Sequence, residues 1–346
     1  MPEAALDQPV APSAPVLTSG RLPTAPVFIL GRQHCGNTVT TLIVGRMTGC
    51  FAIRDEGIFF EHRARLDRMP LAPRAEWIAR NMRVEEPDLA ARVAEYLPRW
   101  AADHPQADAL ALYLEAMRFL TEQAGASFWC QKGTSYIFMA REILRAIPDA
   151  RLVYMVRNPY DVCASKKKRF PDRERIIGWA VSWNRGLSIA SALASAMPHR
   201  VMLVKYEEMV TDPTSVGRTL SAFVGVPFDP AILDVPHINP AEQQHTVVAG
   251  TKGLNTSRRY YYLDRLSKSE IKALDLMISR RLIRAFYPDL PHRTERMGVR
   301  ALLGAWWLIL SGPFRYLGNR LWWSRKQGYS FFRRTFGRFF TARAGV

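Results

Sequence analysis

Short apolar runs alternate with longer segments of helical composition between residues 27 and 290. The apolar runs lie at residues 27–30, 151–156 and 200–205, and the helical segments lie at 38–47, 140–146 and 176–196. Short runs bounded by glycine or proline predict buried strands, and the longer segments predict helices. Strands that alternate with helices predict an α/β fold, with a central parallel sheet flanked by helices and ligands at the carboxyl ends of the strands.

Two further regions depart from this alternation. Residues 70–126 are charged and poor in strand signals, so we expect a helical insertion over the sheet edge, within one domain at 27–290. Residues 1–26 are rich in proline and alanine, with neither a basic start nor an apolar core of signal-peptide length. We therefore expect a disordered leader there.

The segment 291–346 is predicted to be a separate basic and aromatic tail. Nine of the last 50 residues are basic and none is acidic. Phe332, Phe336 and Phe339 recur at helical spacing with arginines on another side, which is typical of an interfacial membrane anchor. The apolar stretch 301–310 is too short to span a bilayer and adds two tryptophans. The alternative is a pair of helices that packs on the protein or on a second subunit.

The composition favours an anionic partner. The chain has 48 Lys and Arg residues against 31 Asp and Glu residues, a formal net charge of +17. Nucleic acid, a charged small molecule and an anionic membrane surface all fit such a charge. The four cysteines are scattered, which favours a reducing compartment. We expect a cytoplasmic protein, peripheral to the inner face of the membrane if the tail acts as an anchor.

The first apolar run leads into a glycine-bounded loop at 31–36 (GRQHCG). A strand that turns through glycines into a helix presents free backbone N–H groups and the positive end of the helix dipole, which together bind anions. Gly36, Asn37 and Thr38 would supply these donors. The glycine spacing is that of a Walker loop, but Asn37-Thr38 stands where Lys-Ser/Thr would. An ordinary nucleotide kinase is therefore disfavoured.

A second motif follows the second apolar run. Arg157 comes directly after the strand predicted at 151–156, and Ser165 lies eight residues further on, near the start of a helix. An arginine fork and a hydroxyl at a strand end suit a second phosphate. Two anion sites on adjacent strands indicate a nucleotide that is phosphorylated at both ends.

These motifs resemble those of sulfotransferases that use 3'-phosphoadenosine-5'-phosphosulfate (PAPS), of the group that includes carbohydrate and tyrosylprotein sulfotransferases. In that family a loop, usually Gly-x-Pro-Arg/Lys-Ser-Gly-Thr-Thr, binds the 5'-phosphosulfate. A strand ending in Arg-x-Pro, with a serine eight residues after the arginine, binds the 3'-phosphate. The matching residues here are Gly31, Gly36, Thr38, Arg157, Pro159, Asp161, Val162 and Ser165. The resemblance extends from about residue 27 to about 288 and includes segments 129–134, 183–184, 205–213 and 220–227.

The resemblance implies a P-loop-like sulfotransferase fold, PAPS as the sulfuryl donor and no metal requirement. It implies a hydroxyl-bearing acceptor, and we expect a carbohydrate or, if the tail binds membrane, a glycolipid, with no nucleic acid partner. The helical insertion, which would build the acceptor pocket, has no pattern that identifies the acceptor. The cofactor-binding residues that it implies are Arg32, His34, Cys35, Gly36, Asn37, Thr38, Arg157 and Ser165, with Lys252, Ser257 and Arg258 in a basic segment that folds over the nucleotide.

Catalytic roles are implied in the same way. Lys132 matches the family's lysine that contacts the sulfonate or the bridging oxygen. Glu56 lies at about the place of a glutamate that often acts as the base, and the adjacent Asp55 is an alternative. His34 and His62 are rivals, because histidine is the commonest general base near neutral pH.

The first loop departs from the family pattern at four places. Gln33 replaces the proline, His34 the basic residue, Cys35 the serine and Asn37 the first threonine. The backbone donors are unaffected, but the fixed charge is lost, since the ordinary pKa of histidine is near 6.5. Nearby anions would favour protonated His34, and Arg32 is another source of charge. The alternatives are a P-loop-type kinase, a non-catalytic protein that binds polyanions or membranes, and a degenerate sulfotransferase.

Overall fold

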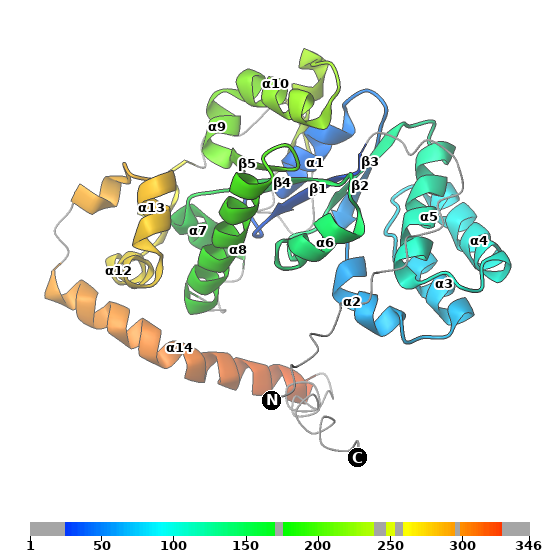
Figure 1. Cartoon of the computed structure of the whole chain (residues 1–346). Coiled ribbons are helices and arrows are strands. Elements are labelled where there is room, and N and C mark those ends of the chain that lie inside the picture. The colour runs from blue at the N-terminus through cyan, green and yellow to red at the C-terminus, as the bar shows by residue number, and fades with distance from the viewer. Residues whose placement is uncertain (1–24, 170–175, 239–246, 253–258, 295–297, 327–346) are drawn as a thin grey trace, which may run out of the picture.

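The computed structural model of the protein describes residues 25–169, 176–238, 247–252, 259–294 and 298–326. Its centre is a five-stranded sheet in the order β2-β3-β1-β4-β5, in which every neighbouring pair is parallel (Figure 1). The strands are β1 (Val27–Gly31), β2 (Cys50–Glu56), β3 (Phe128–Lys132), β4 (Arg151–Val156) and β5 (Val201–Lys205). The prediction of an α/β fold with a central parallel sheet flanked by helices is confirmed.

Side chains of the central strand alternate between two separate cores. Phe28 and Leu30 of β1 belong to one buried cluster, and Val27 and Ile29 belong to the other. This follows from the period of two along a strand, and it requires apolar residues at every position because both faces are covered. The four residues are fully buried.

Different sets of helices cover the two faces of the sheet. The face of Phe28 packs against α6 (Ala140–Ala146) and α8 (Ile176–Ala196), together with the helical region described next. The face of Val27 packs against α1 (Asn37–Gly45), α9 (Tyr206–Thr211) and α10 (Pro213–Val224). The helices predicted at 38–47, 140–146 and 176–196 thus correspond to α1, α6 and α8.

The span 70–126 contains three helices, α3 (Leu71–Arg80), α4 (Pro87–Asp103) and α5 (Ala109–Gln123), which follow α2 (Phe59–Leu66). They lie together at one side of the sheet, beyond β2 (Figure 1). This agrees with the expected helical insertion, while the domain boundaries stay a prediction.

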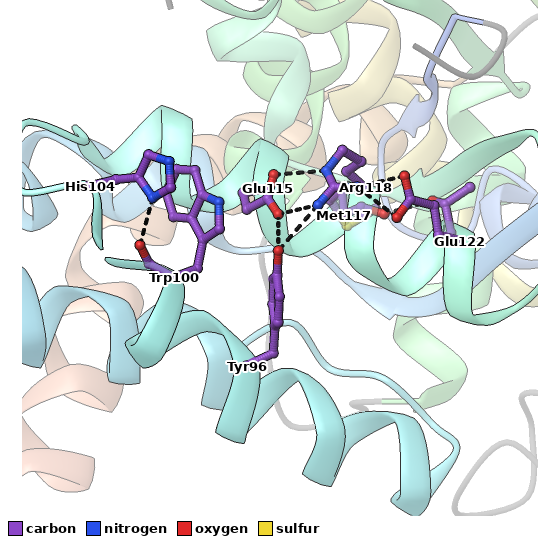
Figure 2. Close-up of polar contacts among 8 residues, drawn as sticks. Tyr96, Trp100, His104, Glu115, Met117, Arg118 and Glu122 are labelled. Atoms are coloured by element: carbon purple, nitrogen blue, oxygen red, sulfur yellow. Dashed lines mark hydrogen bonds and ion pairs between the residues drawn. The ribbon is translucent and has the colours of Figure 1, made fainter. Parts of the chain in front are cut away.

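A polar cluster joins α4 to α5 within this region (Figure 2). Arg118 of α5 donates to Glu115, to Glu122 and, at 3.1 Å, to the hydroxyl oxygen of Tyr96 on α4. Tyr96 in turn donates to Glu115. Because Glu115 is largely buried and Arg118 is half-buried, these bonds satisfy a carboxylate that would otherwise be costly to bury.

The chain after β5 completes the molecule with helices α11 (Tyr262–Arg265), α12 (Lys268–Met277), α13 (Arg280–Phe286) and α14 (Val299–Lys326), and a two-stranded sheet of β6 (Pro236–Ile238) and β7 (Val247–Lys252). Figure 1 shows α14 at the outer edge of the protein, beyond α12 and α13. Within the described ranges, no helix combines the length and the apolar character needed to cross a membrane. The predicted tail helix around Phe332 and Phe336 lies outside the described residues.

Candidate active site

The loop between β1 and α1 is closed by its glycines and by Asn37. Gly31 and Gly36 have φ values of 147° and 98°, which side chains rarely tolerate. A Cβ atom on Gly36 would lie 2.7 Å from the ring of Tyr206, and one on Gly31 would lie 2.8 Å from the carbonyl oxygen of Met155. The side-chain amide nitrogen of Asn37 donates to the carbonyl oxygen of Gly31 at 2.9 Å. Asn37 therefore ties the helix start to the strand end.

Helix α1 begins at this loop with a residue that has no capping side chain. The cap residue is Gly36, whose carbonyl oxygen accepts from the N–H of Thr40 at 3.0 Å. The N–H groups of the first turn have no intrahelical partner, because such partners begin only four residues into a helix. With the helix dipole, they form an anion-binding position at the carboxyl end of β1.

The second motif lies beside the first because β4 pairs with β1, with Gly31 opposite Met155. Arg157 follows β4 and is buried, and its guanidinium donates to the carbonyl oxygen of His34 at 2.7 Å. The guanidinium also lies 4.2 Å from the ring centroid of Tyr206. Its own carbonyl oxygen accepts from the indole of Trp183 at 3.0 Å. The arginine is therefore held at three points and joins the two motifs.

Lys166 is a candidate binding residue that the sequence analysis did not select. It lies on α7 (Pro159–Arg169), directly after Ser165, and is only 8% exposed. Its ammonium donates to the side-chain oxygen of Gln33 at 3.2 Å and lies 3.6 Å from the ring centroid of Trp179. Lys166 brings a fixed positive charge to the loop that has no lysine of its own. Its place in a run of three lysines next to Ser165 was the available signal.

Arg32 provides a second cation at the same loop. Its guanidinium lies 5.4 Å from the ring centroid of Phe138 and 5.8 Å from that of Trp179. Arg185 of α8 lies on the Phe138 ring as well, at 5.1 Å. The Nε atom of Arg32 is buried without a hydrogen-bond partner among the described residues. A buried donor of this kind is costly unless a ligand accepts from it.

Glu56 and Lys132 lie opposite each other on neighbouring strands, β2 and β3. The carboxylate of Glu56 accepts from the backbone N–H of Thr134 at 2.9 Å and from the Thr134 hydroxyl. The ammonium of Lys132 donates to the hydroxyl oxygen of Thr38, at a long 3.4 Å. Glu56 and Lys132 therefore lie at the carboxyl end of the sheet, where the loop after β1 also lies.

Burial shifts the pKa values of both Glu56 and Lys132. It raises the pKa of Glu56, against the opposing effects of the Thr134 N–H and of the Lys132 charge. It also lowers the pKa of Lys132, against the attraction of Glu56 and Asp55. Burial brings the two pKa values closer together, and perturbed pKa values of this kind are common at functional sites.

The alternative bases lie in other surroundings. Asp55 is exposed and forms a 3.0 Å ion pair with Arg83. Although burial opposes it, hydrogen bonds from the Glu56 N–H and from Arg83 lower the pKa of Asp55. His62 of α2 packs edge-on against Trp77, with ring centroids 5.2 Å apart. Glu56, in contrast, contacts the loop that follows β3, where it accepts from Thr134.

The remaining predicted residues fall into two groups. Cys35 is buried, and burial raises its thiol pKa to about 12 despite the nearby Arg157, while Ser165 is half-buried on α7. The backbone of Lys252 ends β7. Ser257, Arg258 and the side chain of Lys252 lie outside the described part of the chain. The binding roles of all these residues stay predictions.

Asp161 holds the segment that follows the undescribed residues 253–258. Its buried carboxylate accepts from the backbone N–H groups of Tyr260 at 3.0 Å and Tyr262 at 2.9 Å. Burial raises the pKa of Asp161 to about 6, and the charge of Arg157 opposes this shift. Asp161 therefore links α7, which carries Ser165, to the start of α11.

Comparison with known proteins assigns the family. The sequence matches the sulfotransferase family over residues 26–230, and the chain belongs to that family. A search of curated proteins found no significant match. The fold is similar to the sulfotransferase domain of the olefin synthase from Synechococcus PCC 7002, with a TM-score of 0.52 and 19% identity over 79% of this chain and 98% of that one. The protein is thus a sulfotransferase-family enzyme. The alternative prediction of a nucleotide kinase does not agree with this family.

Two other structures show weaker similarity. The sulfotransferase domain from the curacin biosynthetic pathway is 16% identical, with a TM-score of 0.43 over 84% of this chain and 98% of that one. Retinol dehydratase, solved with androsterone and the inactive cofactor PAP, is 13% identical, with a TM-score of 0.35 over 79% of this chain and 84% of that one. The fold similarity therefore rests on the olefin synthase domain. None of these comparisons identifies the carbohydrate or tyrosylprotein subgroup.

The described residues contain no group of three or more His, Cys, Asp or Glu side chains arranged to hold a metal ion. The expectation of a reaction without a metal stays a prediction.

Proposed function

We propose that this protein transfers the sulfuryl group of PAPS to a hydroxyl group of an acceptor. The observation that carries this proposal is the hydrogen bond from Arg157 to the carbonyl oxygen of His34, which joins the two anion motifs at neighbouring strand ends. A nucleotide with phosphate groups at both its 5' and 3' positions needs two such sites in a fixed relationship.

The residues present fit such a nucleotide. At the first motif, close approach of the backbone is possible because Gly31 and Gly36 have no Cβ, and Lys166 and Arg32 add charge. The buried Nε atom of Arg32 is a donor in need of an acceptor. We assign the 5' end to the N–H groups of Gly36, Asn37 and Thr38 with these cations. The 3'-phosphate is assigned to Arg157 and Ser165.

PAPS supplies an activated sulfuryl group whose leaving group is a phosphate oxygen. Lys132 is placed to stabilise the negative charge that develops on that oxygen, because its ammonium reaches the Thr38 hydroxyl at the first turn of α1. Glu56 is placed to accept the proton of the acceptor hydroxyl, and its hydrogen bonds from Thr134 fix the orientation of the carboxylate. A pKa raised by burial makes Glu56 a stronger base than an exposed carboxylate.

The acceptor class that we propose to test first is a carbohydrate or a glycolipid. This part of the proposal rests on the resemblance to the carbohydrate sulfotransferase group and on exposed apolar side chains of α14, such as Trp306 and Trp307, which would favour an acceptor at a membrane. We expect the helical region α3 to α5, which lies beyond β2, to contribute to the acceptor pocket.

Calorimetric titration tests which nucleotide the protein binds. The protein is titrated with adenosine 3',5'-bisphosphate (PAP), with ATP and with AMP, and Arg157→Ala serves as the control variant. Micromolar binding of PAP alone, lost in the variant, is expected. Equal binding of all three nucleotides, or of none, would contradict the proposal. Transfer is then measured as PAP formation from PAPS that depends on an added sugar or glycolipid fraction.

A further inference from the structure

Helix α14 carries a row of large apolar side chains on the face that points away from the protein. Six residues form this outer stripe and are between 48% and 78% exposed: Val299, Leu303, Trp306, Trp307, Leu310 and Phe314. Their spacing of three or four residues places them on one side of an α-helix. A surface helix normally shows polar residues on this side, so the stripe needs an apolar partner.

The opposite face of α14 is already packed, and it combines small residues with the partly buried Leu308 and Ile309. Ala301 and Ala305 are buried, and Gly304 is so close to Ser269 of α12 that a side chain would clash. A Cβ atom on Gly312 would lie 2.7 Å from Ile177 of α8. Because this packed face is anchored on α8 and α12, the outer stripe cannot turn inward without loss of this packing.

The chain after the stripe is strongly basic. Eight arginine or lysine residues and no acidic residue follow Phe314: Arg315, Arg320, Arg325, Lys326, Arg333, Arg334, Arg338 and Arg343. Tryptophan side chains prefer the boundary between lipid headgroups and acyl chains, and basic segments next to an apolar face are attracted to anionic headgroups. The stripe contains two tryptophans, and the residues that follow it in sequence carry positive charge, which is complementary to anionic headgroups.

We propose that the outer stripe of α14 docks on the surface of a membrane that contains anionic lipids. The helix lies flat in the headgroup region, with its packed face on α8 and α12 and the rest of the protein on the water side. The stripe supplies apolar contact, and the basic residues after Phe314 supply attraction. This inference does not depend on the proposed transfer reaction, because it uses no residue of the active site.

A second copy of the chain is a less suitable occupant. Each copy has a formal net charge of +17, so two copies would repel each other, whereas an anionic surface would attract the chain.

The experiment uses the full chain and two kinds of vesicle, one of phosphatidylcholine and one that contains about one quarter phosphatidylglycerol. Flotation measures the partition coefficient. We expect a value about tenfold or more higher for the anionic vesicles, reduced in about 0.5 M NaCl by screening. Tryptophan fluorescence should be quenched by lipids brominated near the headgroup. Absence of binding to anionic vesicles, or equal binding to both kinds, would overturn the proposal.

Matched variants test the stripe itself. The double variant Leu303→Ser/Leu310→Ser removes two stripe leucines, and Leu276→Ser/Val181→Ser removes two exposed apolar side chains elsewhere. The stripe variant should lose about tenfold in partition, and the control should change by less than about twofold. Unchanged binding of the stripe variant would contradict the proposal. If light scattering shows a dimer that the stripe variant dissociates, and neither protein binds vesicles, the stripe is a subunit interface instead.

Discussion

The guanidinium of Arg157 donates a 2.7 Å hydrogen bond to the carbonyl oxygen of His34 across 123 residues of sequence. The bond joins the end of β4 to the loop after β1, so each motif helps to hold the other in place. Any change at Arg157 should therefore affect both ends of a bound nucleotide.

Replacement of Arg157 tests this coupling. Arg157→Lys keeps the charge but loses the two-pronged guanidinium and its stacking on Tyr206. We expect PAP to bind roughly 10- to 150-fold more weakly, from the loss of about 1.5–3 kcal/mol of charge-assisted hydrogen bonding. Calorimetry measures the affinity, and a thermal melt checks the fold. Unchanged affinity in a folded variant would remove Arg157 from the binding site.

Glu56 is expected to control the rate without controlling binding. Glu56→Gln should lower kcat by about 10²- to 10⁴-fold, because the acceptor hydroxyl loses its base, while PAP affinity stays the same. Asp55→Asn is the matched control, since Asp55 is the adjacent carboxylate but is exposed and paired with Arg83. A larger loss in Asp55→Asn than in Glu56→Gln would assign the base to Asp55. His62→Gln and His34→Gln test the two histidines in the same way.

The pH profile gives an independent test of Glu56. Burial raises the pKa of Glu56, so kcat should rise with pH through a value above that of an ordinary glutamate. Thr134→Val removes the hydroxyl donor to the carboxylate, which destabilises the ionised form. The acidic limb of the profile should then move to higher pH. A limb that moves to lower pH, or does not move, would mean that another group controls it.

Lys166 should supply the positive charge that the first loop lacks. Lys166→Met is expected to weaken PAPS binding by about tenfold or more, while Lys167→Met, which removes an exposed lysine paired with Glu270, should have little effect. The double variant His34→Lys/Lys166→Met should recover much of the loss, because the family's loop carries its cation at position 34. The KM for PAPS, measured for each variant, tests these expectations.

The single variant His34→Lys distinguishes a functional loop, whose positive charge comes from Lys166, from a loop that has lost its function. If Lys166 already provides the charge, a lysine at position 34 should give no gain in activity. A large gain would instead indicate a decayed site.

Asp161 should make stability depend on pH in a defined direction. Its pKa is raised to about 6 in the folded protein from an ordinary value of 3.8, so the folded state holds a proton that the unfolded state has lost. The free energy of unfolding should therefore fall as pH rises from about 4 to about 6, by up to roughly 3 kcal/mol. Urea unfolding of the wild type and of Asp161→Asn, compared at each pH, isolates this contribution. A difference that is constant with pH would contradict the expectation.

Much of the fold could be predicted from local pattern. Strands β1, β4 and β5 are continuous apolar runs, because a strand covered on both faces must be apolar at every position, and such runs are visible in sequence. Strands β2 and β3 were not predicted as strands, since β2 ends in Arg54, Asp55 and Glu56, and β3 ends in Gln131 and Lys132. Two of these polar residues, Glu56 and Lys132, belong to the candidate site.

Short stretches of sequence are enough to predict the order of the two anion motifs, their glycines and their arginine, because each motif depends on residues that are close neighbours in the chain. Three other relationships depend on tertiary packing: Glu56 lies opposite Lys132, Lys166 reaches Gln33, and α14 packs through the face that carries Gly304 and Gly312. These relationships follow from the strand order β2-β3-β1-β4-β5 and from which helix covers which face. Long-range packing sets both, and no local pattern of residues specifies it.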